Sequence, residues 1–120
     1  MQDDVKAEVR GRDLMSGLPK TVILSPEEVR EAIAEPVNAI VDSVISCLGN
    51  APPELAHDLI ERGMYLVGGG GMLKGLANRI AQETEVPVTL VDQPLEAVVM
   101  GAGRCIEAYD QLRVMFMGAR

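Results

Sequence analysis

Hydrophobic and polar positions alternate at the start of the chain, which indicates β-structure. Val5, Ala7 and Val9 alternate with charged residues, and residues 21–24 are mostly β-branched. The turn residues 11–13 and 16–19 separate these two segments. The pattern therefore predicts a short two-stranded hairpin over residues 1–24.

Helical spacing replaces this alternation after residue 24. Ser25-Pro26-Glu27-Glu28 is typical of a helix start, because serine caps the first turn and a glutamate three residues later closes a capping box. Pro36 predicts a break or kink just before it. An apolar stripe then follows to Gly49-Asn50, formed by Val37, Ile40, Val41, Val44, Ile45 and Leu48.

Helices and strands alternate over residues 52–120. A helix from Pro52-Pro53 to Gly63 precedes an apolar strand at residues 64–67, which we expect to be covered on both faces. A helix over residues 72–84, a strand over 87–91 and a final helix from Pro94 complete the pattern. This order predicts an α/β fold with a parallel layer. Two strands are too few for a stable sheet, so the chain is expected to be part of a larger domain.

Composition narrows the function classes. The net charge of −7 opposes binding to nucleic acids and to anionic membranes, and aromatic residues are scarce. No apolar run approaches the length of a membrane span, and residues 1–4 do not resemble the start of a signal peptide. Cys47 and Cys105 lie within apolar helical patterns, which predicts two buried thiols in a reducing compartment.

The run Gly68-Gly69-Gly70-Gly71 is the principal candidate site. It joins the strand at 64–67 to the helix expected near Met72, and its bare backbone amides would allow a ligand to approach closely. It matches neither a Walker A motif nor a dinucleotide fingerprint, so a tight structural corner is the alternative interpretation. Lys74 either reaches an anion at this corner or is simply exposed.

The remaining candidates have structural interpretations. His57 is expected to be solvated or to cap a helix, and the sequence predicts neither a metal site nor a catalytic arrangement. Gly101-Ala102-Gly103 within a helix suggests close packing. The apolar residues 112–117 either dock on a partner, touch a membrane, pack on their own domain or fray.

Several motifs in order resemble one family. They are Gly11-Arg12-Asp13-Leu14, Ser16-Gly17-Leu18-Pro19, Pro52-Pro53-Glu54-Leu55, Glu61-Arg62-Gly63, the segment 66–76 around the glycines and the segment 94–103. Together they resemble MreB, the rod-shape-determining bacterial actin homologues, from about Val9 to Glu107. The resemblance covers only the C-terminal third of the family's length.

The resemblance implies part of an actin-like, ribonuclease H-like ATPase domain. Residues 1–24 would be the tail of subdomain IIB, and residues 25–120 would be part of subdomain IIA. Gly68, Gly69, Gly70 and Gly71, with Met72, would form the adenosine motif beneath the base, ribose and α-phosphate. This chain departs from the family at Val67, usually threonine, and at Gly71, usually alanine or serine. Residues 97–103 would form the second connecting motif, where the two large domains meet.

The same resemblance implies ATP as cofactor, with magnesium in the full-length family. The family's phosphate loops and catalytic acid lie upstream of this chain's first residue, so we expect weak or no ATP binding by this chain alone and no hydrolysis. The implied role is in a cytoplasmic cell-shape cytoskeleton at the inner face of the membrane. Its partners would be copies of itself, full-length filament subunits and the cell-wall synthesis machinery.

Two alternatives remain open at this stage. A truncated paralogue would act as a non-catalytic module that binds filaments. Another actin-like ATPase, such as a chaperone or a plasmid-partitioning filament protein, fits the GRD, SGLP and PPEL motifs less well.

Overall fold

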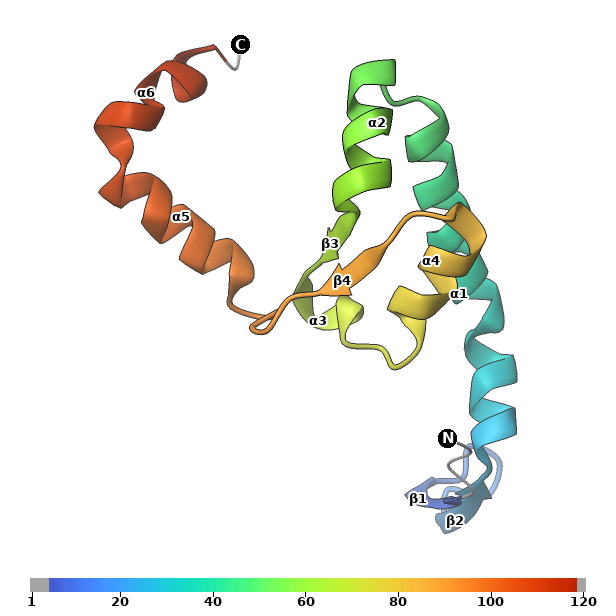
Figure 1. Cartoon of the computed structure of the whole chain (residues 1–120). Coiled ribbons are helices and arrows are strands. Elements are labelled where there is room, and N and C mark those ends of the chain that lie inside the picture. The colour runs from blue at the N-terminus through green and yellow to red at the C-terminus, as the bar shows by residue number, and fades with distance from the viewer. Residues whose placement is uncertain (1–4, 119–120) are drawn as a thin grey trace. The chain divides into compact units, whose positions relative to one another are not determined.

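The computed structural model describes residues 5–118 and divides the chain into two units. The division falls inside helix α1 (Pro26–Gly49), between Asp42 and Ser43. Figure 1 shows the elements along the chain, and each unit is described by itself. The prediction about residues 1–4 lies outside the described residues. The assignment of residues 1–24 and 25–120 to two subdomains stays a prediction.

The first unit opens with the hairpin expected from the alternating residues. Strands β1 (Ala7–Arg12) and β2 (Pro19–Leu24) pair antiparallel, with Val9 opposite Val22. Gly11 and Arg12, expected in the turn, extend β1 instead, because they pair with Lys20 and Pro19 across the hairpin. The turn is therefore confined to residues 13–18.

A reciprocal capping box begins helix α1, as the sequence predicts. The Ser25 N–H donates to Glu28 Oε2 at 2.8 Å, and the Glu28 N–H donates to Ser25 Oγ at 3.2 Å. The bond from the Ser25 backbone, followed by the Ser25 hydroxyl, holds the pKa of the Glu28 carboxyl below its ordinary value.

This capping box predicts a pH-dependent helix start. A lowered pKa in the folded state means that ionised Glu28 stabilises the helix above its unfolded pKa, and that this stability is lost as pH falls through the folded pKa. We expect Glu28→Gln, which can still accept the Ser25 N–H, to lose less helical circular dichroism signal than wild type between about pH 5 and pH 3. Glu31→Gln, one turn along the same helix, is the control. An identical loss of helical circular dichroism signal with falling pH in wild type and in Glu28→Gln would contradict this role of the Glu28 carboxylate.

Helix α1 continues through Pro36, so the helix does not break there, and the alternative of a kink stays a prediction. Proline at this position removes one backbone hydrogen bond, yet apolar helical spacing on both sides keeps the segment helical. By length and composition alone, α1 could cross a membrane, contrary to the expectation that no stretch reaches that length. One such helix is weak evidence, because core helices of soluble proteins pass the same test.

The second unit is built around two parallel strands. Helix α2 (Pro53–Arg62) ends at Gly63, and strand β3 (Met64–Leu66) then pairs with β4 (Val88–Leu90) in parallel, as the sequence predicts. Helix α4 (Leu76–Thr84) packs against β4 and buries Leu76 and Ile80 (Figure 1). Val41 and Val86 are the other buried hydrophobic residues in the described part of the chain.

Cover on both faces of the strand at residues 64–67 is not observed. Tyr65 is 70% exposed, and Val67 is also exposed. Cys47 is exposed and Cys105 is half-buried, so the prediction of two buried thiols is also wrong. Within residues 5–118, the chain supplies too few layers to bury these apolar side chains.

The chain continues with two short helices rather than one. The final helix, expected from Pro94, begins at Ala97 after a turn, so that α5 spans Ala97–Glu107 and α6 spans Tyr109–Met117. The two helices contact each other. In α6 the rings of Tyr109 and Phe116 stack with their centroids 6.3 Å apart. The apolar side chains of residues 114–117 are exposed, so this segment does not pack into the core of the described chain.

Candidate functional site

The glycine run forms a strand-to-helix corner with a geometry that differs from the expected one. Gly68–Gly71 is itself one short helical segment, α3, which follows extended Val67. The longer helix expected from Met72 begins instead at Leu76, after a turn in which Gly75 has a φ of +87°. The four glycines therefore make the first helical turn rather than a loop before it.

The four glycines of this corner differ in their backbone conformation and in the space that a side chain would find there. Gly68 has a φ of +80°, a conformation that other residues rarely adopt. Gly71 is buried, and a Cβ there would lie 2.9 Å from Leu66 Cγ. A Cβ on Gly69 would lie 3.3 Å from a Leu95 methyl carbon, whereas one on Gly70 would meet nothing within 4 Å. Gly68 and Gly71 thus serve the fold, and Gly70 leaves its outer side open.

Backbone amides are available on the open side of the corner. The Gly68 N–H donates to the Pro94 carbonyl oxygen at 2.7 Å, which ties the corner to the segment after β4. Met72 and Leu73 donate back to Gly69 and Gly70 carbonyl oxygens at 3.1 and 3.2 Å. Gly69 and Gly70 are exposed and lie at the start of α3, where the first backbone N–H groups of a helix have no partner within the helix. These two N–H groups can therefore donate hydrogen bonds to the oxygen atoms of a polar ligand.

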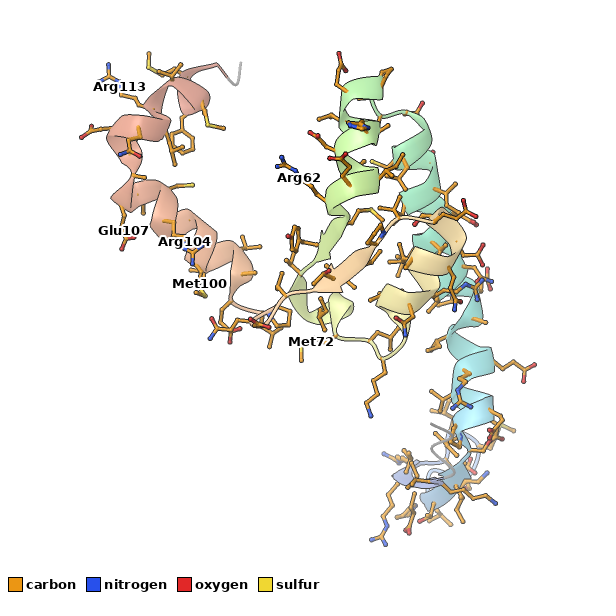
Figure 2. All side chains as sticks on the ribbon, viewed as in Figure 1. Arg62, Met72, Met100, Arg104, Glu107 and Arg113 are labelled. Atoms are coloured by element: carbon orange, nitrogen blue, oxygen red, sulfur yellow. The ribbon has the colours of Figure 1, made fainter. Side chains whose placement is uncertain are left out.

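Met72 lies directly after these donors. Its side chain is 50% exposed and extends from the end of α3 (Figure 2). Lys74 is exposed in the following turn. The predicted residues Gly68, Gly69, Gly70, Gly71 and Met72 are therefore brought together, with a half-exposed thioether beside open backbone amides. An adenine ring has the apolar face that such a side chain can contact.

A separate hollow of about 480 Å³ lies beside α5. It is lined by Val91, Asp92, Gln93, Ala97, Met100, Gly101 and Arg104. Met100 and Arg104 extend from the same helix in Figure 2. The sequence singled out Gly101 for close packing, yet a Cβ on Gly101 or Gly103 would meet no atom within 4 Å. The hollow shares no residue with the glycine corner, and sequence reasoning missed the Asp92 and Arg104 side chains that line it.

Neither the histidine nor a cluster of metal-ligating side chains contributes to the glycine corner among the described residues. His57 lies 3.5 Å from Glu61 on the exposed side of α2, which confirms its solvated placement. Within the described range no three metal-ligating side chains gather in one place. The groups that the corner offers to a ligand are therefore backbone N–H donors, with the exposed Lys74 side chain in the turn that follows.

Solved structures identify the class of protein to which this fold belongs. The chain is similar to MreB5 of Spiroplasma citri bound to ADP, with a TM-score of 0.84 and 29% identity over 96% of this chain and 35% of that one. The same protein bound to AMPPNP gives a TM-score of 0.83 over 92% of this chain and 33% of that one, again at 29% identity. The fold is therefore part of an actin-like ATPase domain, as the sequence motifs imply.

Sequence comparisons then define the family. The model of the MreB/Mbl protein family matches residues 1–114, so the chain belongs to this family. It is 43% identical over 109 residues to the cell shape-determining protein MreB of Escherichia coli (strain K12), covering 90% of this chain and 31% of that protein. It is 41% identical over 104 residues to the cell shape-determining protein Mbl of Bacillus subtilis (strain 168), covering 87% and 31%. The chain thus spans about a third of the length of the curated relatives it matches.

Proposed function

We propose that this chain serves a cell-shape cytoskeleton of the MreB type and supplies the adenosine-binding corner of its nucleotide site. Membership of the family and the names of its cell shape-determining relatives support the cytoskeletal role. The corner itself carries the nucleotide role, because two exposed amides and an open glycine surface lie together at Gly69 and Gly70. The related MreB5 structures bound to ADP and AMPPNP support the same choice of ligand.

The geometry suits one edge of an adenine nucleotide. Amides in the first turn of a helix donate well to phosphate and hydroxyl oxygens, and the missing side chain at Gly70 lets such an oxygen approach the backbone. Met72 would lie against the apolar face of the base. Ligand sites usually enclose most of the ligand surface, whereas this corner contributes one wall. We therefore propose weak or no ATP binding by this chain alone and no hydrolysis. Magnesium and the groups that act on the phosphates would come from elsewhere in the family's fold.

Nuclear magnetic resonance of the labelled chain tests this assignment at single residues. On titration with ADP to millimolar concentration, we expect weak binding with shifts concentrated at the amide signals of Gly69, Gly70 and Met72. Signals of Gly49 and Gly103, which lie outside the corner, should stay in place. Gly70→Val should abolish the shifts without unfolding the chain, because space is open where its Cβ would lie. Gly101→Val, at another open position, is the matched control.

Two results would overturn the nucleotide assignment. One is measurable binding of ADP without any shift at the amide signals of Gly69, Gly70 and Met72, which would remove the corner from the nucleotide site. The other is a set of shifts around Asp92 and Arg104, which would move the site to the hollow beside α5. A micromolar affinity for ATP would instead refute the proposal that this chain holds only one wall of the site.

The cellular setting is part of the same proposal. The chain would act in the cytoplasm, at the inner face of the membrane, and would associate with copies of itself or with longer filament subunits. The cell-wall synthesis machinery would be the further partner. Family membership supports the self-association.

A further inference from the structure

The hollow of about 480 Å³ lies outside the carboxyl end of strand β4, within the second unit. Residues 91–93, which follow the last residue of that strand, line one side of it, and helix α5 lines the other. In open α/β sheets, ligands bind outside the carboxyl ends of the parallel strands. The volume is within the range of sites for small molecules. Position and size are therefore those of a ligand site.

One face of α5 forms the helical side of the hollow. The α5 residues that line it recur at i, i+3, i+4 and i+7, so they share one face of the helix. They are Ala97, Met100, Gly101 and Arg104. Met100 and Arg104 extend from this helix in Figure 2. A Cβ on Gly101 would meet no atom within 4 Å, so the missing side chain leaves the hollow open at this position.

One carboxylate and one guanidinium group line the hollow without meeting. Asp92 lies on the segment after β4, and Arg104 lies two turns along α5. Within residues 5–118, no ion pair or side-chain hydrogen bond engages either group. Two opposite charges on the two sides of one hollow can hold a ligand that carries both charges itself.

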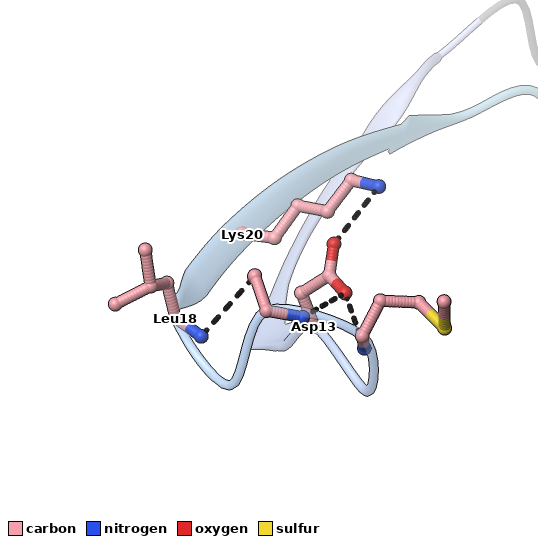
Figure 3. Close-up of polar contacts among 5 residues, drawn as sticks. Asp13, Leu18 and Lys20 are labelled. Carbon is pink, nitrogen blue, oxygen red and sulfur yellow. Dashed lines mark hydrogen bonds and ion pairs between the residues drawn. The ribbon is translucent and has the colours of Figure 1, made fainter.

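The hollow beside the hairpin shows the contrasting arrangement. It has a volume of about 310 Å³, and Asp13 and Lys20 are among the residues that line it. Their charges are already paired, because Lys20 Nζ lies 3.4 Å from Asp13 Oδ2 (Figure 3). Asp13 Oδ1 also accepts the Met15 N–H at 2.7 Å. A charged ligand would have to displace these contacts, whereas no such contact joins Asp92 to Arg104 in the described part of the chain.

The charges in the hollow beside α5 decide between classes of ligand. Asp92 would repel a phosphate group, and the net charge of −7 adds to that repulsion. A simple cation would leave Arg104 without a partner. A dipeptide carries both a carboxylate and an ammonium group, and it spans up to about 7 Å, so it can reach between two groups that do not touch. Its side chains would lie against the apolar part of the lining, which is Val91, Ala97 and Met100.

We propose that this hollow binds a short apolar peptide, about two residues long, through its free ammonium and carboxylate groups. Arg104 donates two N–H groups to the peptide carboxylate, and Asp92 accepts hydrogen bonds from the ammonium group. The Gln93 side chain lies beside them and can bond to the peptide group between the two charges. This binding function goes beyond the proposed cytoskeletal role and does not depend on the nucleotide corner, which shares no residue with the hollow.

Nuclear magnetic resonance titration of the labelled full chain with leucyl-leucine tests the proposal. We expect shifts at the amide signals of Asp92, Gln93 and Arg104, with a dissociation constant on the order of 1 mM. N-acetyl-leucyl-leucine lacks the ammonium group, and leucyl-leucine amide lacks the carboxylate. Each should bind at least about tenfold more weakly than leucyl-leucine, because each loses a charge-assisted hydrogen bond.

Two substitutions assign each charge of the peptide to one side chain. In Asp92→Asn, acetylation of the peptide should no longer weaken binding. In Arg104→Gln, amidation of the peptide should no longer weaken binding. Both side chains are exposed, so the variants should fold, which matching circular dichroism spectra would establish. Arg113→Gln removes an exposed arginine on α6 and is the matched control, which should keep both differences between the peptides.

Gly101→Val tests the space in the hollow. Its side chain would occupy part of the open volume, and we expect it to abolish the shifts with leucyl-leucine. Gly103→Val, at another open position of α5 that does not line the hollow, is the matched control. Gly70→Val should keep the peptide shifts, and Gly101→Val should keep the ADP shifts. These two variants therefore distinguish a failure of this proposal from a failure of the nucleotide assignment.

Four results would overturn the proposal. The first is the absence of shifts at the hollow in excess leucyl-leucine, and the second is equal affinity for the three peptides. The third is a loss of affinity in Arg113→Gln as large as that in Arg104→Gln. The fourth is a set of shifts at the hollow that ADP produces at lower concentration than leucyl-leucine, which would assign the hollow to a nucleotide instead.

Discussion

Gly63→Ala is expected to lower the free energy of unfolding by about 2–4 kcal/mol. Gly63 follows helix α2 with a φ of +75°, where any side chain strains the backbone. A Cβ at this position would also collide with the Pro87 carbonyl oxygen. That oxygen accepts the Met64 N–H at 2.7 Å, at the start of the β3–β4 pairing. The substitution therefore strains the backbone and displaces the first hydrogen bond between the strands.

Urea unfolding followed by circular dichroism measures this effect. Gly101→Ala is the matched control, because Gly101 lies inside helix α5 and its Cβ would meet no atom within 4 Å. We expect the control to stabilise the chain by up to about 1 kcal/mol, the usual gain from replacing glycine by alanine in a helix. Equal shifts for the two variants would show that Gly63 does not hold the strand corner.

Ile80→Ala is expected to cost about 2–4 kcal/mol of unfolding free energy. Ile80 is 3% exposed on α4, the helix that packs against β4. Truncating it leaves a cavity in a core that contains only three other buried hydrophobic side chains among residues 5–118, those of Val41, Leu76 and Val86. Because small domains are marginally stable, a loss of this size is a large share of the total.

Ile60→Ala is the matched control, because it removes the same side chain from an exposed position and so leaves no cavity in the core. Ile60 is 67% exposed on α2, so its truncation should change the unfolding free energy by less than about 0.5 kcal/mol. The same urea experiment compares the two isoleucine variants. A cost at Ile60 as large as that at Ile80 would mean that α4 does not form the core.

Local signals in the sequence predicted most element types correctly. Ser25 and Glu28 correctly predicted the start of a helix, and the alternating residues around Val9 correctly predicted a strand. Both signals are local, because helix capping and the side-chain period of a strand depend only on near neighbours in the sequence. Pro36 does not break helix α1, because the one backbone hydrogen bond that it removes does not outweigh the helical preference of the residues around it. The apolar strand at 64–67 misled the burial prediction, because Tyr65 lacks cover within the described chain.

The sequence likewise predicted only some features of the candidate site. The glycine run and its strand-to-helix position were evident in the sequence, as were the motifs of the MreB/Mbl family. Which glycines serve the fold was not evident, because Gly71 is required by its distance to Leu66, a side chain that reaches it only in the folded chain. The hollow lined by Asp92 and Arg104 was missed for a related reason, since it joins the end of β4 to two turns of α5.

The amino-acid sequence alone determined the family, the order of most helices and strands, and the location of the glycine corner, because these depend on residue types at fixed short spacings. Only the tertiary structure decided which glycines of the corner stay exposed, which side chains are buried and which residues line the hollow beside α5. Those properties depend on atoms brought together from distant positions. No local pattern of residues encodes them.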